Sequence, residues 1–240
     1  MATQYQILIQ MSAQTVQALQ QNGFTLFGFK AVQSTAHGMP TVWLATGQIG
    51  MNVAVSWTEE YQAYVSLTSV MAGAQVIASA EYDIDLGQTL TITNATGIGT
   101  VTQGGSQGAV CIANQTTTQF TSGIAQGANG SSSPTCAFPL FGQNAELIVP
   151  LEQVALIFST QSANPGTIVQ QSHGPGIVID MTGASQRTVT FDINQGWSAG
   201  GAVWAQPFPG NTDLVPLLIQ HSPQLSAMKA ALDLTAESAS

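Results

Sequence analysis

Three carboxylates occupy alternate positions in the segment Glu81-Tyr82-Asp83-Ile84-Asp85. Because side chains alternate sides along a β-strand, a strand here would place all three carboxylates on one face. Calcium prefers several oxygen ligands at one point, yet same-face neighbours on a strand stand about 7 Å apart. The favoured interpretation is therefore a solvated face with Tyr82 and Ile84 turned inward. A weak calcium site at Glu81, Asp83 and Asp85 is the alternative, and no other cofactor is expected.

Other catalytic patterns are poorly supported. The segment 104–108 reads Gly-Gly-Ser-Gln-Gly and matches the G-x-S-x-G nucleophile elbow, which needs a buried strand before the serine and a helix after it. Here the pattern lies in a glycine-rich polar segment followed by another β-like run. His37, His173 and His221 show no metal-ligand spacing. Without a constellation of acid, base and metal ligands, we predict that the protein is not an enzyme.

Two cysteines, Cys111 and Cys136, flank a stretch rich in Gly, Ser, Thr and Asn. A disulfide closing this loop and a pair of thiols are both compatible with the spacing. A bridge would close a loop of about 25 residues, for which the chain-entropy model gives roughly 3 kcal/mol. Both alternatives stay open at this point.

Aromatic residues near the C-terminal end are the best candidates for a contact surface. Trp197, Trp204 and Phe208 lie among glycines and prolines, and aromatic side chains in such loops are harder to bury than those in strands. We therefore expect ligand or membrane contact through these three residues. The capped edge of a core is the alternative interpretation.

The hydrophobic pattern predicts a mainly β protein. Residues 5–10 read as a strand, Ser12 can cap a short helix that ends at Asn22-Gly23, and residues 24–32 read as a strand covered on both faces. Turn signals then recur at intervals of roughly 8 to 15 residues, which is typical of a sandwich or barrel. We predict one antiparallel β-sandwich or barrel-like domain spanning 1–240, with mobile loops over 97–108 and 122–135.

The C-terminal segment has a different pattern. Ser222-Pro223 provides an N-cap followed by proline at the first helical position, and Leu225, Met228 and Leu232 recur at helical spacing. We predict an amphipathic helix over 222–234 that packs on the sheet, followed by a frayed tail over 235–240.

Charge is scarce: 3 basic residues stand against 12 acidic ones, with a net charge of −9. Nucleic acid binding and docking on anionic lipid both depend on clusters of Lys or Arg, so both are excluded. No apolar run is long enough for a transmembrane helix, and no signal peptide is visible in the chain. An extracellular or released protein is the favoured interpretation.

These features predict function through neutral contacts. A surface of Gln, Thr, Ser and Asn costs little to desolvate, and edge strands without Lys are open to pairing. We predict a non-enzymatic, lectin-like recognition protein that binds neutral lipid headgroups or glycans at cell surfaces. An oligomeric, membrane-active, cytolysin-like toxin is one form of it. The alternative is a structural protein that self-assembles into homo-oligomers, tubes or shells through uncharged sheet edges.

Overall fold

The chain begins with the strand and helix that its sequence predicts, in a computed structural model that describes residues 3–227. Strand β1 spans Gln4–Gln10 and helix α1 spans Ala13–Gln21. The hydroxyl of Ser12 accepts a hydrogen bond from the Thr15 amide at 3.1 Å, which caps the helix. Gly23, with a φ of 68°, supplies the left-handed conformation that ends it.

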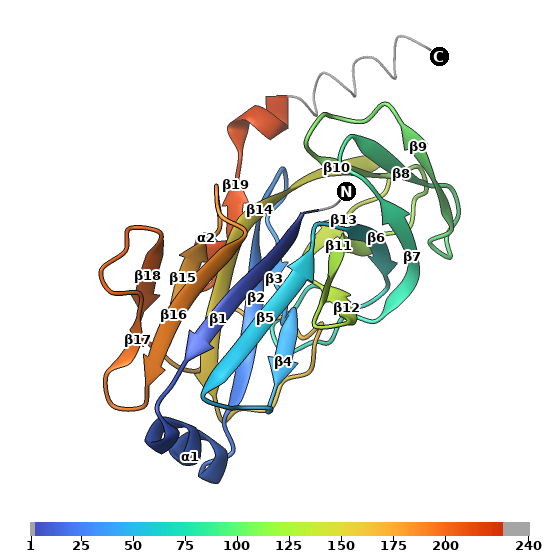
Figure 1. Ribbon diagram of the computed structural model, residues 1–240. Helices are drawn as coiled ribbons and strands as arrows, with labels where there is room; N and C mark the ends of the chain where they lie inside the picture. The colour runs from blue at the N-terminus through green and yellow to red at the C-terminus, as the bar shows by residue number, and fades with distance from the viewer. Residues whose placement is uncertain (1–2, 228–240) are drawn as a thin grey trace.

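Three sheets make up the mainly β architecture (Figure 1). Most strand pairs are antiparallel, as predicted, but β1–β16, β8–β10 and β2–β19 are parallel. The four-stranded sheet has the order β17 (Gly196–Ser198), β16 (Gln186–Asp192), β1 and β5 (Asn52–Thr58).

The nine-stranded sheet has the main order β18 (Ala205–Phe208), β15 (Gly176–Asp180), β14 (Asn144–Ser159), β10 (Val110–Asn114), β8 (Gln88–Ile92) and β9 (Gly99–Gln103). Strand β2 (Thr25–Ser34) also pairs with β14, and β4 (Leu44–Thr46) and β19 (Ile219–His221) pair with β2. The six-stranded sheet has the order β3 (Met39–Pro40), β13 (Cys136–Leu140), β11 (Phe120–Ala128), β6 (Tyr61–Ser66) and β7 (Ala78–Ile84), and β12 (Ser131–Pro134) pairs with β11. A short helix α2 (Val215–Leu218) precedes β19.

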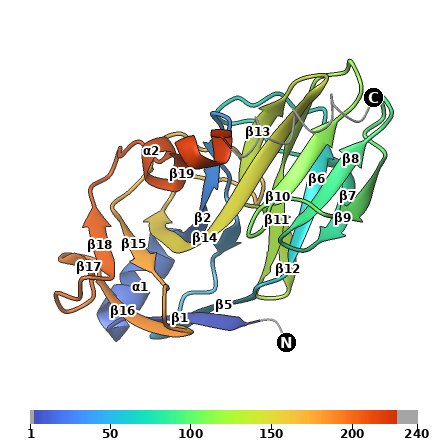
Figure 2. The same cartoon turned by 90° about the horizontal axis from the view of Figure 1, so that it is seen from above.

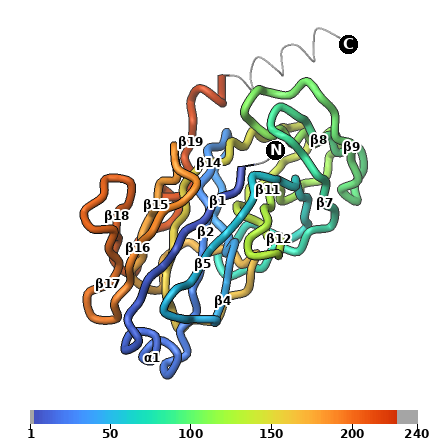
Figure 3. Tube along the Cα trace, viewed as in Figure 1, coloured from blue at the N-terminus to red at the C-terminus, as the bar shows by residue number. Residues whose placement is uncertain are grey.

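Strand β14 joins two halves of the molecule, which lie side by side in Figure 2. Its first part contributes Ile148 to a core shared with β6, β8, β10 and β11. Its second part contributes Leu156 and Phe158 to a core under the four-stranded sheet. The chain path in Figure 3 passes between the halves along β14, and β2 pairs with it over most of its length. The prediction of a single domain stays a prediction, and this continuous strand is consistent with it.

Small residues in the middle of the chain form strands where the sequence predicted loops. Segment 97–108 contains β9, and segment 122–135 contains most of β11 together with β12. On β11, a Cβ on Gly123 would lie only 2.2 Å from the Cys136 carbonyl oxygen and 2.8 Å from the Tyr64 hydroxyl oxygen. The small side chains are therefore required by close packing of neighbouring strands. The loop prediction is wrong for most of 122–135 and for residues 99–103, whereas residues 97–98 and 104–108 do lie outside the strands.

The C-terminal prediction is tested only at its beginning. Helical residues start at Pro223, and the Leu225 amide donates to the Ser222 hydroxyl at 3.4 Å, as expected of an N-cap. Leu225 is buried. Met228, Leu232 and the predicted tail over 235–240 lie outside the described residues. Within 3–227, no helix is long and apolar enough to cross a membrane.

Candidate functional site

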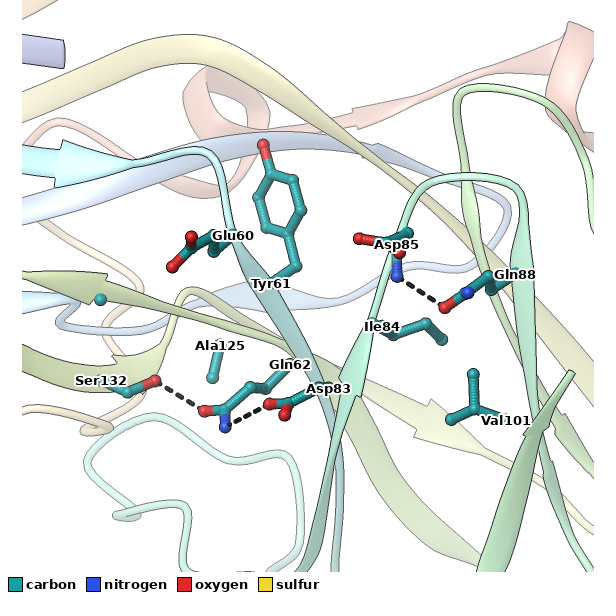
Figure 4. A pocket seen from close by; sticks show the side chains of 11 residues that line it. Glu60, Tyr61, Gln62, Asp83, Ile84, Asp85, Gln88, Val101, Ala125 and Ser132 are labelled. Carbon is teal, nitrogen blue, oxygen red and sulfur yellow. Dashed lines mark hydrogen bonds between the residues drawn. The ribbon is translucent and has the colours of Figure 1, made fainter. Parts of the chain in front are cut away.

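A groove of about 590 Å³ lies beside the paired ends of β6 and β7 (Figure 4). Tyr61 and Gln62 open strand β6, and Asp83 and Ile84 close strand β7. The register pairs Gln62 with Asp83, which brings residues from the two strands together. The remaining lining comes from neighbouring turns and from β8, β9, β11 and β12: Glu60, Asp85, Gln88, Val101, Ala125, Gly127 and Ser132.

The Gln62 amide is fixed inside the groove by two side chains. Its Nε2 donates to Asp83 Oδ1 at 3.0 Å, and its Oε1 accepts from the Ser132 hydroxyl at 3.0 Å. Figure 4 shows the Gln62 amide between Ser132 and Asp83, with one of these bonds on each side of it. Because the amide orients Asp83 from one side, the second carboxylate oxygen of Asp83 is left to accept a hydrogen bond from a ligand.

Carboxylates dominate the electrostatics of the groove. Glu60, Asp83 and Asp85 all line it and are all exposed. The two basic residues in the described part of the chain, Lys30 and Arg187, are absent from the lining. The groove therefore offers hydrogen-bond acceptors and repels anionic groups such as phosphate or sulfate. Val101, which is half-buried, adds apolar surface between the polar groups, whereas Ile84 is 3% exposed and packs into the core beneath them.

Lys30 lies in the interior rather than on the surface. It is 5% exposed on β2, and its Nζ stands 4.5 Å from the Trp57 ring centroid and 5.3 Å from that of Trp43. Burial lowers the pKa of Lys30 to about 7, and the negative charges of Glu59 and Glu152 act in the opposite direction. Sequence analysis did not single out this residue, because an alternating strand pattern says nothing of which side chains lie opposite.

Two tyrosines share the electrostatic environment of Lys30. The Tyr5 hydroxyl donates to Glu152 Oε1 at 2.7 Å, and burial together with this bond raises the pKa of Tyr5. Burial, and then the charge of Glu59, raises the pKa of Tyr61. Both phenols therefore stay protonated at neutral pH. The hydrogen bond between Tyr5 and Glu152 joins β1 to β14 beside this buried amine.

The segment 81–85 has the arrangement favoured in the sequence analysis, with its carboxylates in solvent and Tyr82 and Ile84 turned inward. Tyr82 and Ile84 pack on the core, and Glu81, Asp83 and Asp85 are exposed. Across residues 3–227, no group of three or more His, Cys, Asp or Glu side chains is placed to hold a metal ion. The alternative calcium site at Glu81, Asp83 and Asp85 therefore gains no support, whereas Asp83 and Asp85 enter the groove.

The predicted aromatic contact surface needs correction. Trp197 and Phe208 are buried, at 6% and 9% exposure, so neither is available at the surface. Trp197 stacks on Phe158 with ring centroids 5.3 Å apart, and Phe208 packs against the bare backbone of Gly176. Gly176 pairs with Phe208 across neighbouring strands, and its lack of a side chain leaves room for the buried ring. Trp204 is half-buried, with the Arg187 guanidinium 4.7 Å from its ring centroid.

The cysteines are buried thiols. The structure has no disulfide between Cys111 on β10 and Cys136 on β13, so the thiol alternative holds. Burial raises the pKa of Cys136 to about 12, although hydrogen bonds involving Ile124 and Thr135 counteract part of that effect. Such a thiol is a poor nucleophile at neutral pH.

The remaining catalytic patterns are not assembled. Ser106 is buried at 9% exposure in the turn after β9, and no helix follows it; the next element is β10. His37 and His221 stack on each other with centroids 5.3 Å apart, while His173 is exposed on another segment. Neither arrangement reproduces a nucleophile with an adjacent base.

The groove is thus a concave polar site built from several strands, and it contains Asp83 and Asp85 of the site residues that the sequence predicted. Its volume falls within the range of about 300–1,000 Å³ that is usual for small-molecule sites. We find no family model, no curated protein and no solved structure that matches this chain.

Proposed function

We propose that the protein is a non-enzymatic recognition protein whose groove binds a neutral glycan. The observation that carries the proposal is the set of groups in the groove: three exposed carboxylates, the oriented Gln62 amide and the half-buried apolar side chain of Val101. Sugar hydroxyls donate to carboxylates in charge-assisted hydrogen bonds, and their C–H faces pack on apolar groups.

The electrostatics support a ligand without negative charge. The negative charges of Glu60, Asp83 and Asp85 act together on any ligand in the groove. Neither basic residue of the described part of the chain lines the groove to offset them. An acidic sugar or a phosphorylated ligand would be repelled at low ionic strength. An amine ligand would also satisfy the carboxylates, and the experiment below separates it from a glycan.

The test is isothermal titration calorimetry with neutral cello-, manno- and chito-oligosaccharides, and with spermidine as the amine probe. Asp83→Asn should weaken sugar binding about tenfold or more, because an oriented, charge-assisted acceptor is lost. Glu81→Gln is the matched control: Glu81 is exposed on the same strand two positions away and is not part of the lining. Binding of spermidine alone would replace the glycan by an amine ligand.

A second candidate function is self-assembly, and strand β9 supports it. β9 ends the path of the nine-stranded sheet, and its sequence Gly-Thr-Val-Thr-Gln carries no charge and no proline. Such an edge lacks the features that usually block pairing with another chain. Sedimentation velocity would show assemblies that dissociate in Thr100→Lys if this edge makes the contact. A monomer at all concentrations would remove the candidate.

A further inference from the structure

One end of the half that contains the six-stranded sheet exposes four large apolar side chains. Leu67 is 65% exposed, Ile77 72%, Ile98 57% and Phe141 53%, which is half of the large apolar residues that are exposed among 3–227. We call these four residues the apolar tip. Scattered single apolar residues are ordinary on a protein surface, so the question is whether these four lie together.

Strand registers place them at the same end. Ser66 pairs with Ala78, so Leu67 and Ile77 face each other at the start and end of the β6–β7 connection. Thr121 pairs with Ser66 and Phe120 with Leu140, which brings Phe141 to this end as well. Figure 2 shows β6, β7, β11 and β13 side by side in this half.

Two further contacts bring in Ile98. A Cβ on Gly97 would lie 3.2 Å from Val65 Cγ1, so the turn carrying Ile98 packs on the end of β6. The Gln115 amide donates to the Ile92 carbonyl at 3.0 Å, and Asn114 Nδ2 donates to the Phe141 carbonyl at 3.1 Å. The turns after β8, β10 and β13 are thereby tied to one another.

Among the described residues, the turns that carry or adjoin the four tip side chains hold no Asp, Glu, Lys or Arg. Segments 67–77, 93–98, 115–119 and 141–143 contain no Asp, Glu, Lys or Arg, and the sequence between Leu86 and Ala145 holds none either. Between the apolar side chains stand Thr, Asn, Gln, Ser and Gly, which hydrogen-bond without carrying a charge. This chemistry matches the interface of a lipid bilayer whose headgroups have no net charge, because nothing ionised must be dehydrated there.

From this arrangement we propose that the apolar tip inserts into the interface of a zwitterionic lipid bilayer. Anionic lipid does not fit, because its attraction depends on clustered Lys and Arg. Here Lys30 is buried, Arg187 lies on β16 in the other half, and the acids outnumber the bases. Apolar side chains on separate turns of a rigid end each enter the interface individually, as the anchors of interfacial proteins do.

Insertion at this end leaves the groove free. Gln62 lies four residues before Ser66 along β6, which is about 13 Å at the rise of a strand. The groove therefore lies toward the end of β6 that is opposite the tip, and the test of membrane docking and the test of glycan binding can fail separately.

The test is vesicle flotation with phosphatidylcholine vesicles, and with vesicles that also contain phosphatidylserine. The unaltered protein should float with phosphatidylcholine, and phosphatidylserine should not increase the bound fraction. The double variant Ile98→Ser/Phe141→Ser should lower the partition coefficient about 100-fold, since each lost anchor counts for roughly tenfold. All four tip side chains are exposed, so the variant should keep the melting temperature of the parent.

The matched control is Met51→Ser/Val203→Ser, which removes two apolar side chains that are 57% and 103% exposed and lie outside the tip. This control should float like the parent. Equal flotation of both double variants, or binding that needs phosphatidylserine, would overturn the proposal. The proposal would also be overturned if the protein did not bind vesicles and instead sedimented as an oligomer that is absent in the tip variant. The tip would then contact a second copy of the chain.

Discussion

Lys30 Nζ stands 4.5 Å from the centre of the Trp57 ring, so one of the three basic side chains of the chain is enclosed by aromatic groups instead of facing water. Trp43 approaches the same ammonium group from a second direction, with its ring edge-on to Trp57 at an interplanar angle of 87°. Cation–π attraction offsets part of the cost of removing the charged amine from water, and the negative charges of Glu59 and Glu152 offset a further part of that cost.

Stability should depend on pH through Lys30. Its pKa falls from 10.5 to about 7 on folding, so between these values the unfolded chain binds a proton that the folded protein does not. The free energy of unfolding should therefore rise from pH 7 to pH 9, by up to about 1.4 kcal/mol per pH unit. Below pH 7 the folded and the unfolded chain both bind the proton, so Lys30 no longer makes the free energy of unfolding depend on pH.

Lys30→Met should flatten that slope, as measured by urea denaturation at pH 6, 7.5 and 9. The pH range stays below the titration of Tyr5 and Tyr61, whose raised pKa values would act in the opposite direction at higher pH. Arg187→Met removes the other described basic side chain and should keep the slope. A wild-type protein with no slope over this range would contradict the buried position of the Lys30 charge.

Gly123 should tolerate no side chain, because its Cβ would stand 2.2 Å from a backbone oxygen. We expect Gly123→Ala to lower the free energy of unfolding by about 1–3 kcal/mol through overpacking. Gly127→Ala on the same strand is the control, since a Cβ there meets nothing within 4 Å. Chemical denaturation compares the two, and equal stabilities would show that β11 is not packed as described.

Cys136 should resist alkylation in the folded protein. Its thiol is buried, and a pKa of about 12 leaves almost no thiolate at pH 8. Iodoacetamide labelling followed by mass spectrometry should show modification of this residue only after denaturant is added. Dithiothreitol should leave the melting temperature unchanged, whereas a drop of several degrees would indicate a disulfide.

Local signals in the sequence predicted the first elements correctly. Ser12 and Gly23 mark the ends of α1, and the alternation over 24–32 predicted a strand covered on both sides. Strand β11 was missed because Ser122 and Gly123 have little intrinsic strand preference. Their place in a strand follows from packing against Tyr64 and Cys136, which are distant in sequence.

The site was harder to predict than the fold. Asp83 was chosen for its spacing, yet its neighbours in the groove, Gln62 and Ser132, depend on the β6–β7 and β11–β12 registers, which no local pattern specifies. Trp197 and Phe208 were misassigned for the related reason that their burial depends on partners distant in sequence, Phe158 for Trp197 and Gly176 for Phe208.

The central claim is that a neutral glycan occupies the groove between Gln62, Asp85 and Ser132. The most direct measurement is a map of backbone amide shifts in a two-dimensional NMR titration with the neutral oligosaccharides that give heat in calorimetry. We expect the largest shifts on residues 60–62, 83–88 and 132. Shifts confined to residues around Trp204, or no shift at saturating sugar, would contradict it.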